Sequence, residues 1–211
     1  GGLGSVSLTG GTEVDNFIIG STGSIVGTDL DVITDFLSAT DTITFGSTLT
    51  VAANAVGAAV AGTHPNISSG YATFASTDNT LDAKIATLQA FETTLGTNVA
   101  VAFNDSSSAY IYYTGASSSV TTDDQLVKLT GLTATTLTAA SNKVTGIADV
   151  TAPTVSSAAL SASTGNLVSA VYYANDGDTI SGTVTFSESV TVTGSPTITL
   201  TVGSTATTAT Y

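Results

Sequence analysis

Residues 31–45, DVITDFLSATDTITF, decide how this chain begins to fold. Apolar side chains recur through the stretch at the spacing of short strands, while Asp31, Asp35 and Asp41 stand among them. The stretch contains no lysine and no arginine. Because an isolated charge is costly to bury, these carboxylates need compensating partners. The stretch therefore predicts short β-strands whose acidic residues are balanced by something other than a basic side chain.

The whole chain repeats this charge imbalance. Its 211 residues include 16 acidic residues against 3 lysines, which gives a formal net charge of −13. Three lysines cannot form a phosphate-binding surface, and we therefore expect no nucleic-acid partner. The negative net charge also disfavours adsorption to anionic lipid. A compact body this acidic repels itself unless it holds counter-ions. Bound cations are the obvious candidates.

The remaining composition predicts a folded protein without disulfides. The mean hydropathy is +0.37, which argues against disorder, and cysteine is absent, which excludes thiolate metal sites. The most apolar small-residue run, 51–62, is about half the length of a membrane helix, so we expect no membrane insertion. Methionine is absent and the chain opens with GGLGSVSLTGG. We therefore expect a piece of a longer chain or a processed product.

Strand and turn signals dominate the order of elements. Residues 1–50 alternate short β segments with Gly, Thr and Asp turns. Residues 78–96 predict one helix, capped by Asp78 or Thr80 and ended by Gly96. Its apolar face would consist of Leu81, Ile85, Leu88, Phe91 and Leu95. Strands at 98–103 and 109–114, joined as a hairpin, and another at 124–132 complete the first domain, residues 1–148.

A second domain is predicted for residues 149–211. Its strands alternate apolar and polar residues, as in Ile198, Leu200 and Val202. An immunoglobulin-like sandwich needs roughly 100 residues and seven strands, so we expect an incomplete sandwich of about five strands. Such a domain has a bare sheet edge, which favours pairing with a partner or with another copy. The fold class expected for the whole chain is mainly β.

Two segments carry the resemblance to a known family. GGTEVDNFIIG (10–20) and VGTDLDVITDFLSATDTITF (26–45) are similar to the glycine- and aspartate-rich template of the RTX family, whose members bind calcium in a β-roll. The order VDNFIIG, DVITDF and TDTITF resembles the exit of such rolls, and the likeness covers residues 8–46. The two matched aspartates, Asp15 and Asp31, are 16 residues apart, whereas two nine-residue turns need 18, so a long regular roll is not expected.

The resemblance implies calcium as the cofactor. Carboxylates and carbonyls on successive turns supply the six to eight oxygens that calcium prefers. The alternative is that these aspartates are solvated turn residues. We favour calcium, at one to three sites, because six carboxylates fall within a short span without a cation. The candidate ligands are Glu13, Asp15, Asp29, Asp31, Asp35 and Asp41.

The second domain has its own resemblance. DVTAP followed by NDGDTISGTVTFSESVTVTGSPTITLTVG is similar to immunoglobulin-like and cadherin-like repeats of bacterial surface proteins. In that group, acidic residues near domain junctions bind calcium. This implies the candidate ligands Asp149, Asp176, Asp178 and Glu188. A simple turn at Asn-Asp-Gly explains the same pattern equally well, and both alternatives stay open.

Motifs for catalysis are missing from the sequence. His64 is the only histidine, it lies in a predicted loop, and no G-x-S-x-G elbow accompanies it. A zinc hydrolase would need several His or Cys ligands, which the sequence does not supply. Neither a P-loop nor a dinucleotide fingerprint occurs in the sequence. A glycosidase needs only two carboxylates, which this composition supplies, but calcium binding explains the paired acids better. Tyrosines such as Tyr110, Tyr112, Tyr113, Tyr172 and Tyr173 offer stacking faces for sugar, although packing in a β core is the favoured interpretation.

The sequence therefore predicts a non-catalytic, calcium-binding structural segment of a large bacterial cell-surface protein, either a surface-layer subunit or an adhesin. The RTX resemblance implies type I secretion and an extracellular location. The expected partners are further copies of a surface protein and cell-surface polysaccharide. The alternative function is a carbohydrate-binding or accessory module of a type I-secreted hydrolase.

Overall fold

The computed structural model is mainly β, as the sequence predicts, with one α-helix among the described residues. It describes residues 4–20, 26–27, 29–46, 48–55, 57–149, 153–162, 166–168, 171–173, 179–187, 190, 192, 194–202 and 204–210. Within these ranges, no helix combines the length and apolar character that a membrane span requires. The chain divides into two compact units, residues 1–151 and residues 152–211, where the sequence predicted a boundary near residue 148.

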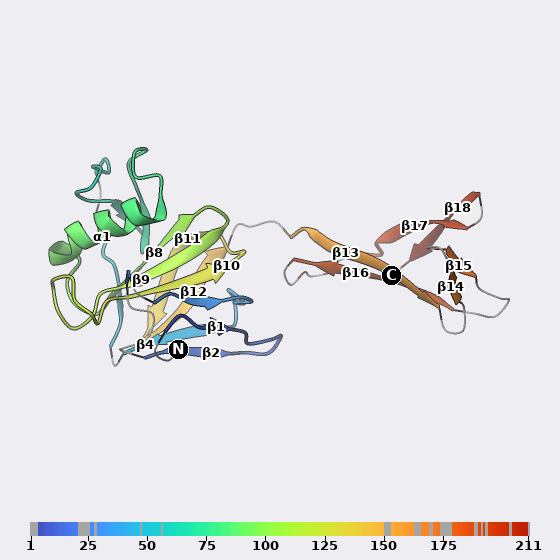
Figure 1. Ribbon diagram of the computed structural model, residues 1–211, viewed down its shortest axis with the longest axis horizontal. Helices are drawn as coiled ribbons and strands as arrows, with labels where there is room; N and C mark the ends of the chain where they lie inside the picture. The colour runs from blue at the N-terminus through green and yellow to red at the C-terminus, as the bar shows by residue number, and fades with distance from the viewer. Residues whose placement is uncertain are drawn as a thin grey trace. The chain divides into compact units, whose positions relative to one another are not determined.

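Two sheets form the frame of the first unit (Figure 1). The larger sheet has eight strands in the order β1-β3-β10-β9-β8-β7-β6, with β5 paired beside β8, and the smaller sheet has the order β11-β12-β4-β2. The strand bounds are β1 (Ser7–Leu8), β2 (Asn16–Ile19), β3 (Asp31–Ile33), β4 (Thr42–Phe45), β5 (Thr50–Val51), β6 (Asn66–Ser68), β7 (Tyr71–Thr73), β8 (Val99–Asp105), β9 (Ser108–Tyr113), β10 (Gln125–Thr130), β11 (Ala134–Ala140) and β12 (Lys143–Asp149). The predicted hairpin is confirmed as β8 and β9, which pair antiparallel.

The main core lies between the two sheets. Strands β2 and β4 of the smaller sheet alternate buried and more exposed residues, which directs Phe17, Ile43 and Phe45 inward. The larger sheet contributes residues such as Ile33 and Ile111 to the same cluster. Strand β9 is buried along its whole length, because its other face is covered as well.

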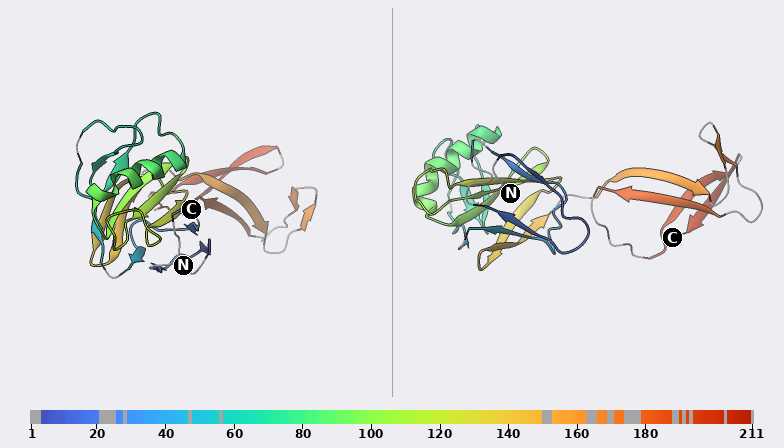
Figure 2. Two further views of the ribbon diagram at one scale, coloured as in Figure 1. Left: turned by 60° about the vertical axis from the view of Figure 1, so that its left-hand side comes forward. Right: turned by 60° about the horizontal axis from the view of Figure 1, so that its bottom comes forward.

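The helix α1 (Leu81–Leu95) covers that other face, against β8 and β9 (Figures 1 and 2). The Thr80 hydroxyl accepts the Ala83 N–H and caps its start, and the helix ends at Gly96, as the sequence predicts. The predicted apolar face is confirmed: Leu88 is fully buried in the core cluster, and the other four residues pack against it half-buried. The sequence did not indicate that Glu92 is buried on this face too.

The N-terminal strands form two stacked coils of a roll. The chain alternates between the sheets from β1 to β4, so that β1 pairs parallel with β3 and β2 pairs parallel with β4. We call residues 4–20 the first coil and residues 29–45 the second coil. The register joins Ser7 to Val32 and Asn16 to Thr42, so that equivalent positions lie 25 or 26 residues apart. The aspartates of the two template matches, Asp15 and Asp31, therefore do not stack on each other.

The second unit consists of three two-stranded antiparallel ribbons in its described parts. They pair β13 (Val155–Ala162) with β16 (Ile180–Phe186), β14 (Asn166–Val168) with β15 (Val171–Tyr173), and β17 (Thr197–Val202) with β18 (Thr205–Thr210). The side chains described here are exposed or half-buried, and Val155 and Phe186 are 60% and 38% exposed. These ribbons fit a mainly β unit, and the immunoglobulin-like sandwich stays a prediction.

Candidate functional site

Asp41 is the most enclosed carboxylate of the roll. Its side chain is 0% exposed, and its two oxygens accept hydrogen bonds from two different backbone amides. Oδ1 accepts from the N–H of Asp15 in the first coil at 2.9 Å, and Oδ2 accepts from the N–H of Leu37 in its own coil at 2.9 Å. Hydrogen bonds to an ionised acceptor are roughly twice as strong as neutral ones, so two of them offset much of the cost of burial.

Asp31 and Asp35 reach back to the first coil in the same way. Asp31 is fully buried at the start of β3, and its Oδ1 accepts the N–H of Val6 at 3.1 Å. Asp35 accepts two adjacent amides, those of Gly10 at 2.9 Å and Gly11 at 2.8 Å, with one oxygen each. These two bonds are exposed to solvent, unlike those of Asp41.

Together the three aspartates form a carboxylate ladder, by which we mean Asp31, Asp35 and Asp41 with the first-coil amides that they accept. Each rung spans 24 to 26 residues, which is the repeat of the roll. The stacking places amides of one coil beside carboxylates of the next. The partial positive charge on these backbone N–H groups thus stabilises the carboxylates in place of the lysine or arginine that the stretch lacks.

The other three candidate ligands of the roll lie outside the ladder. Glu13 is exposed, and Asp29 is half-buried. The Asp15 side chain turns toward Gly10, where a Cβ atom would come within 2.4 Å of its Oδ2. That oxygen is buried and accepts no hydrogen bond from the described residues. Glycine at position 10 is therefore what makes room for this carboxylate.

Calcium binding by these residues stays a prediction. Across the described ranges, no group of three or more Asp, Glu or His side chains lies in a position to hold a metal ion. The ladder explains why: its carboxylates point at separate amides along the coils instead of converging on one point. As they are arranged, these three side chains do not fit a calcium shell, which leaves Glu13, Asp15 and Asp29 as the candidates not engaged by the ladder.

The candidate ligands of the second domain are placed only in part. Asp149 ends β12, and its Oδ1 accepts the N–H of Thr133 at 3.0 Å across the start of β11. Asp176, Asp178 and Glu188 lie outside the described residues. Asp149 thus belongs to the first unit, where it joins the end of β12 to the residue before β11.

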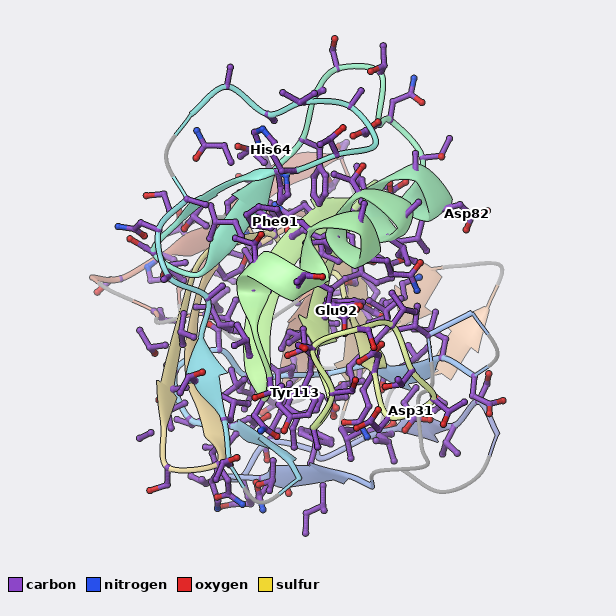
Figure 3. The ribbon with its side chains drawn as sticks, turned by 90° about the vertical axis from the view of Figure 1, so that its left-hand side faces the viewer. Asp31, His64, Asp82, Phe91, Glu92 and Tyr113 are labelled. Carbon is purple, nitrogen blue, oxygen red and sulfur yellow. The ribbon has the colours of Figure 1, made fainter. Side chains whose placement is uncertain are left out.

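A second acidic site lies where α1 meets the larger sheet. Glu92 is 1% exposed and points from the helix toward the sheet (Figure 3). Its Oε2 accepts the Tyr112 hydroxyl at 2.8 Å. The pKa of Glu92 is raised to about 7, mainly by burial; the hydrogen bond from Tyr112 acts to lower it, and the Asp124 carboxylate acts to raise it. Burial and the same two carboxylates raise the pKa of Tyr112, which therefore stays a neutral donor.

Asp124 completes this site from the segment before β10. It is 0% exposed, its Oδ1 accepts the N–H of Gly115 at 3.0 Å, and its Oδ2 accepts the N–H of Thr121 at 2.7 Å. The neighbouring Asp123 accepts the Thr121 hydroxyl and the Ala116 N–H, and these bonds lower its pKa. This site was not predicted from the sequence, although the adjacent carboxylates of Asp123 and Asp124 at the start of a predicted strand were a visible signal.

His64, Tyr110, Tyr112 and Tyr113 pack as structural residues, and the side chains of Tyr172 and Tyr173 lie outside the described part of the chain. His64 lies beside Phe91 with ring centroids 5.9 Å apart, and its Nδ1 is 3.3 Å from the Pro65 carbonyl (Figure 3). Tyr110, Tyr112 and Tyr113 are at most 5% exposed, so they offer no stacking platform. Tyr113 instead donates to the Thr48 carbonyl and stacks on Phe45, as in a packed core.

No family model matches the chain, and no curated protein matches it.

Proposed function

We propose that this chain is a non-catalytic structural segment of a large secreted bacterial cell-surface protein, as a surface-layer subunit or an adhesin. The carboxylate ladder is the observation that carries the proposal. It commits Asp31, Asp35 and Asp41 to cross-linking two coils, which is a structural use of acidic residues. The resemblance of residues 8–46 to the RTX family adds the expectation of type I secretion and an extracellular location.

Calcium is the proposed ligand, and the ladder reduces the number of side chains that are available to bind it. The ladder aspartates already have amide partners, so the ion would use oxygens of Glu13, Asp15 and Asp29, completed by backbone carbonyls or water. The buried Oδ2 of Asp15, which accepts no hydrogen bond from the described residues, supports this choice. An ion that binds only the folded state adds stability according to its free concentration, so weak sites act only where calcium is plentiful.

A thermal melt with particle size followed in parallel tests this function. The full chain is heated in chelator and in about 5 mM calcium, a range suited to weak extracellular sites. The proposal predicts a higher melting temperature in calcium and calcium-dependent growth in particle size, as expected for a lattice or fibre. Equal melting temperatures in the two buffers would remove calcium from the proposal, and unchanged size would remove calcium-driven self-association.

The matched variants are Asp29→Asn and Thr12→Ser. Asp29→Asn should abolish the calcium response while leaving the melting temperature in chelator unchanged, because Asp29 lies outside the ladder. Thr12→Ser, an exposed neutral change in the first coil, should leave both values unchanged. Binding to purified cell-surface polysaccharide is assayed with the same three proteins.

A further inference from the structure

The site between α1 and the larger sheet holds two buried carboxyl groups of unequal surroundings. Glu92 lies one helical turn after Leu88, on the face that packs against the sheet. Its Oε2 has the Tyr112 hydroxyl as a donor, while its Oε1 is buried and accepts no hydrogen bond from the described residues. Oxygen Oε1 is therefore the part of this carboxyl group that lacks a donor.

Asp124 is placed against the same side of the sheet by strand alternation. Leu126 pairs with Tyr112 across β9 and β10, and both belong to the cluster beneath α1. Asp124 lies two residues before Leu126, on the same face, and its side chain comes within hydrogen-bonding reach of Glu92. Both Asp124 oxygens accept a backbone N–H group, and each carboxyl oxygen has a second lone pair that can accept a further hydrogen bond.

No cation offsets an ionised Glu92 within the described part of this site. The groups that act on Glu92 from the packed elements are the Tyr112 hydroxyl on β9 and the carboxylates of Asp124 and Asp123 before β10. On the helix itself, Lys84 is engaged by Asp105 at 2.8 Å. Glu92 also lies in the last turn, where the helix presents carbonyl groups and disfavours negative charge. Two ionised carboxyls would therefore repel each other in a nearly dry site.

We propose that Glu92 and Asp124 form a proton-binding site that ties α1 to the larger sheet, with one proton shared between the two carboxyl groups in the folded protein. The proton resides on Oε1 of Glu92, which donates it to Asp124, while Oε2 continues to accept from Tyr112. Release of this proton leaves two anions facing each other and loosens the helix from the sheet. Docking of α1 thus responds to the pH of the surroundings.

The direction of the pH effect follows from the two states. In the unfolded chain Glu92 titrates at about 4.3, as free glutamate does, and in the folded chain its pKa is raised to about 7. The folded state thus binds the proton more tightly. Its stabilising contribution is complete below the unfolded pKa, declines between these two values, and is lost once the pH exceeds the folded one.

Direct titration of the full chain tests the proton site. The Glu92 carboxyl carbon is followed by NMR from pH 4 to pH 9 in chelator, so that the outcome does not depend on calcium. The site predicts a midpoint near pH 7, two or more pH units above the value of about 4.3 for a free glutamate. A midpoint within about half a unit of the free value would overturn the proposal, whatever the variants do.

Glu92→Gln supplies the second test. A glutamine amide donates to Asp124 and accepts from Tyr112, so it reproduces the protonated carboxyl at every pH. We expect hydrogen exchange of the α1 amides to accelerate several-fold in the wild type between pH 5 and pH 8, after correction for intrinsic exchange, and to stay flat in Glu92→Gln. Asp82→Asn, with the same charge change at an exposed site in the first turn of α1, should keep the pH dependence of the wild type. Equal pH dependence in all three proteins would contradict a proton shared at Glu92.

Discussion

The roll and the helix–sheet interface both bury carboxylates, yet they stabilise them differently. Asp41 in the roll has two amide donors, whereas Glu92 on α1 has one hydroxyl donor and another carboxylate beside it. The difference follows from the backbone. Stacked coils leave N–H groups pointing toward the neighbouring coil, but the N–H groups in a helix interior are used by the helix itself. An acidic side chain is therefore balanced by amides in the roll and by a proton on the helix.

The largest effect is expected for Asp41→Ala. It removes a fully buried acceptor and leaves the amides of Asp15 and Leu37 without their partner, at a cost of about 3 kcal/mol in the free energy of unfolding. Chemical denaturation of the full chain in chelator measures the loss. An equal loss only in calcium, with no effect in chelator, would mean that Asp41 acts as a metal ligand.

Tyr112→Phe is expected to have the next largest effect. It removes the donor to Glu92 Oε2 and costs about 1 kcal/mol. Since this hydrogen bond lowers the pKa of Glu92, its loss should raise that pKa above about 7. NMR titration of the Glu92 carboxyl in the variant checks the direction, and a lowered pKa would contradict the contact.

Asp35→Asn should be milder than the same change at Asp41. An asparagine oxygen still accepts one of the two glycine amides, and solvent reaches the other because both bonds are exposed. We expect a loss of about 0.5 kcal/mol in chelator. Asp41→Asn, measured beside it, should lower the free energy of unfolding by several times more. Equal losses would show that burial does not determine how much each carboxylate of the ladder contributes.

The smallest effect is expected for Glu13→Gln. Glu13 is exposed and lies outside the ladder, so in chelator the free energy of unfolding should change by less than about 0.5 kcal/mol. In calcium, the variant should lose part of any calcium-induced rise in melting temperature. A large loss in chelator would show that the first coil uses this side chain structurally.

Local pattern was sufficient to predict much of the fold. The helix, its Thr80 cap and its end at Gly96 follow from residues close together in the sequence, as does the β8–β9 hairpin. Strands β11 and β12 were not predicted, because residues 133–149 are rich in Thr and Ala and carry little alternation. The pairing of β12 with β4 joins segments about 100 residues apart, which no local pattern indicates.

The acidic residues of the ladder could be predicted from the sequence, but their hydrogen-bond partners could not. The sequence identified Asp31, Asp35 and Asp41 as carboxylates that need compensation, yet backbone amides carry no sequence signal. Only the register of 25 or 26 residues brings those amides to the carboxylates. Glu92 was missed for a related reason: a lone glutamate on an amphipathic helix is usually solvated, and the sheet that buries it comes from residues further along the chain.

Hydrogen exchange of two amides tests the carboxylate ladder most directly. The N–H groups of Asp15 and Leu37 both donate to Asp41, and NMR resolves their exchange in the full chain in chelator. The ladder predicts that both amides are protected without calcium and that Asp41→Ala removes the protection of both together. Fast exchange in the wild type in chelator, with protection only after calcium is added, would contradict it and make the metal the partner of these carboxylates.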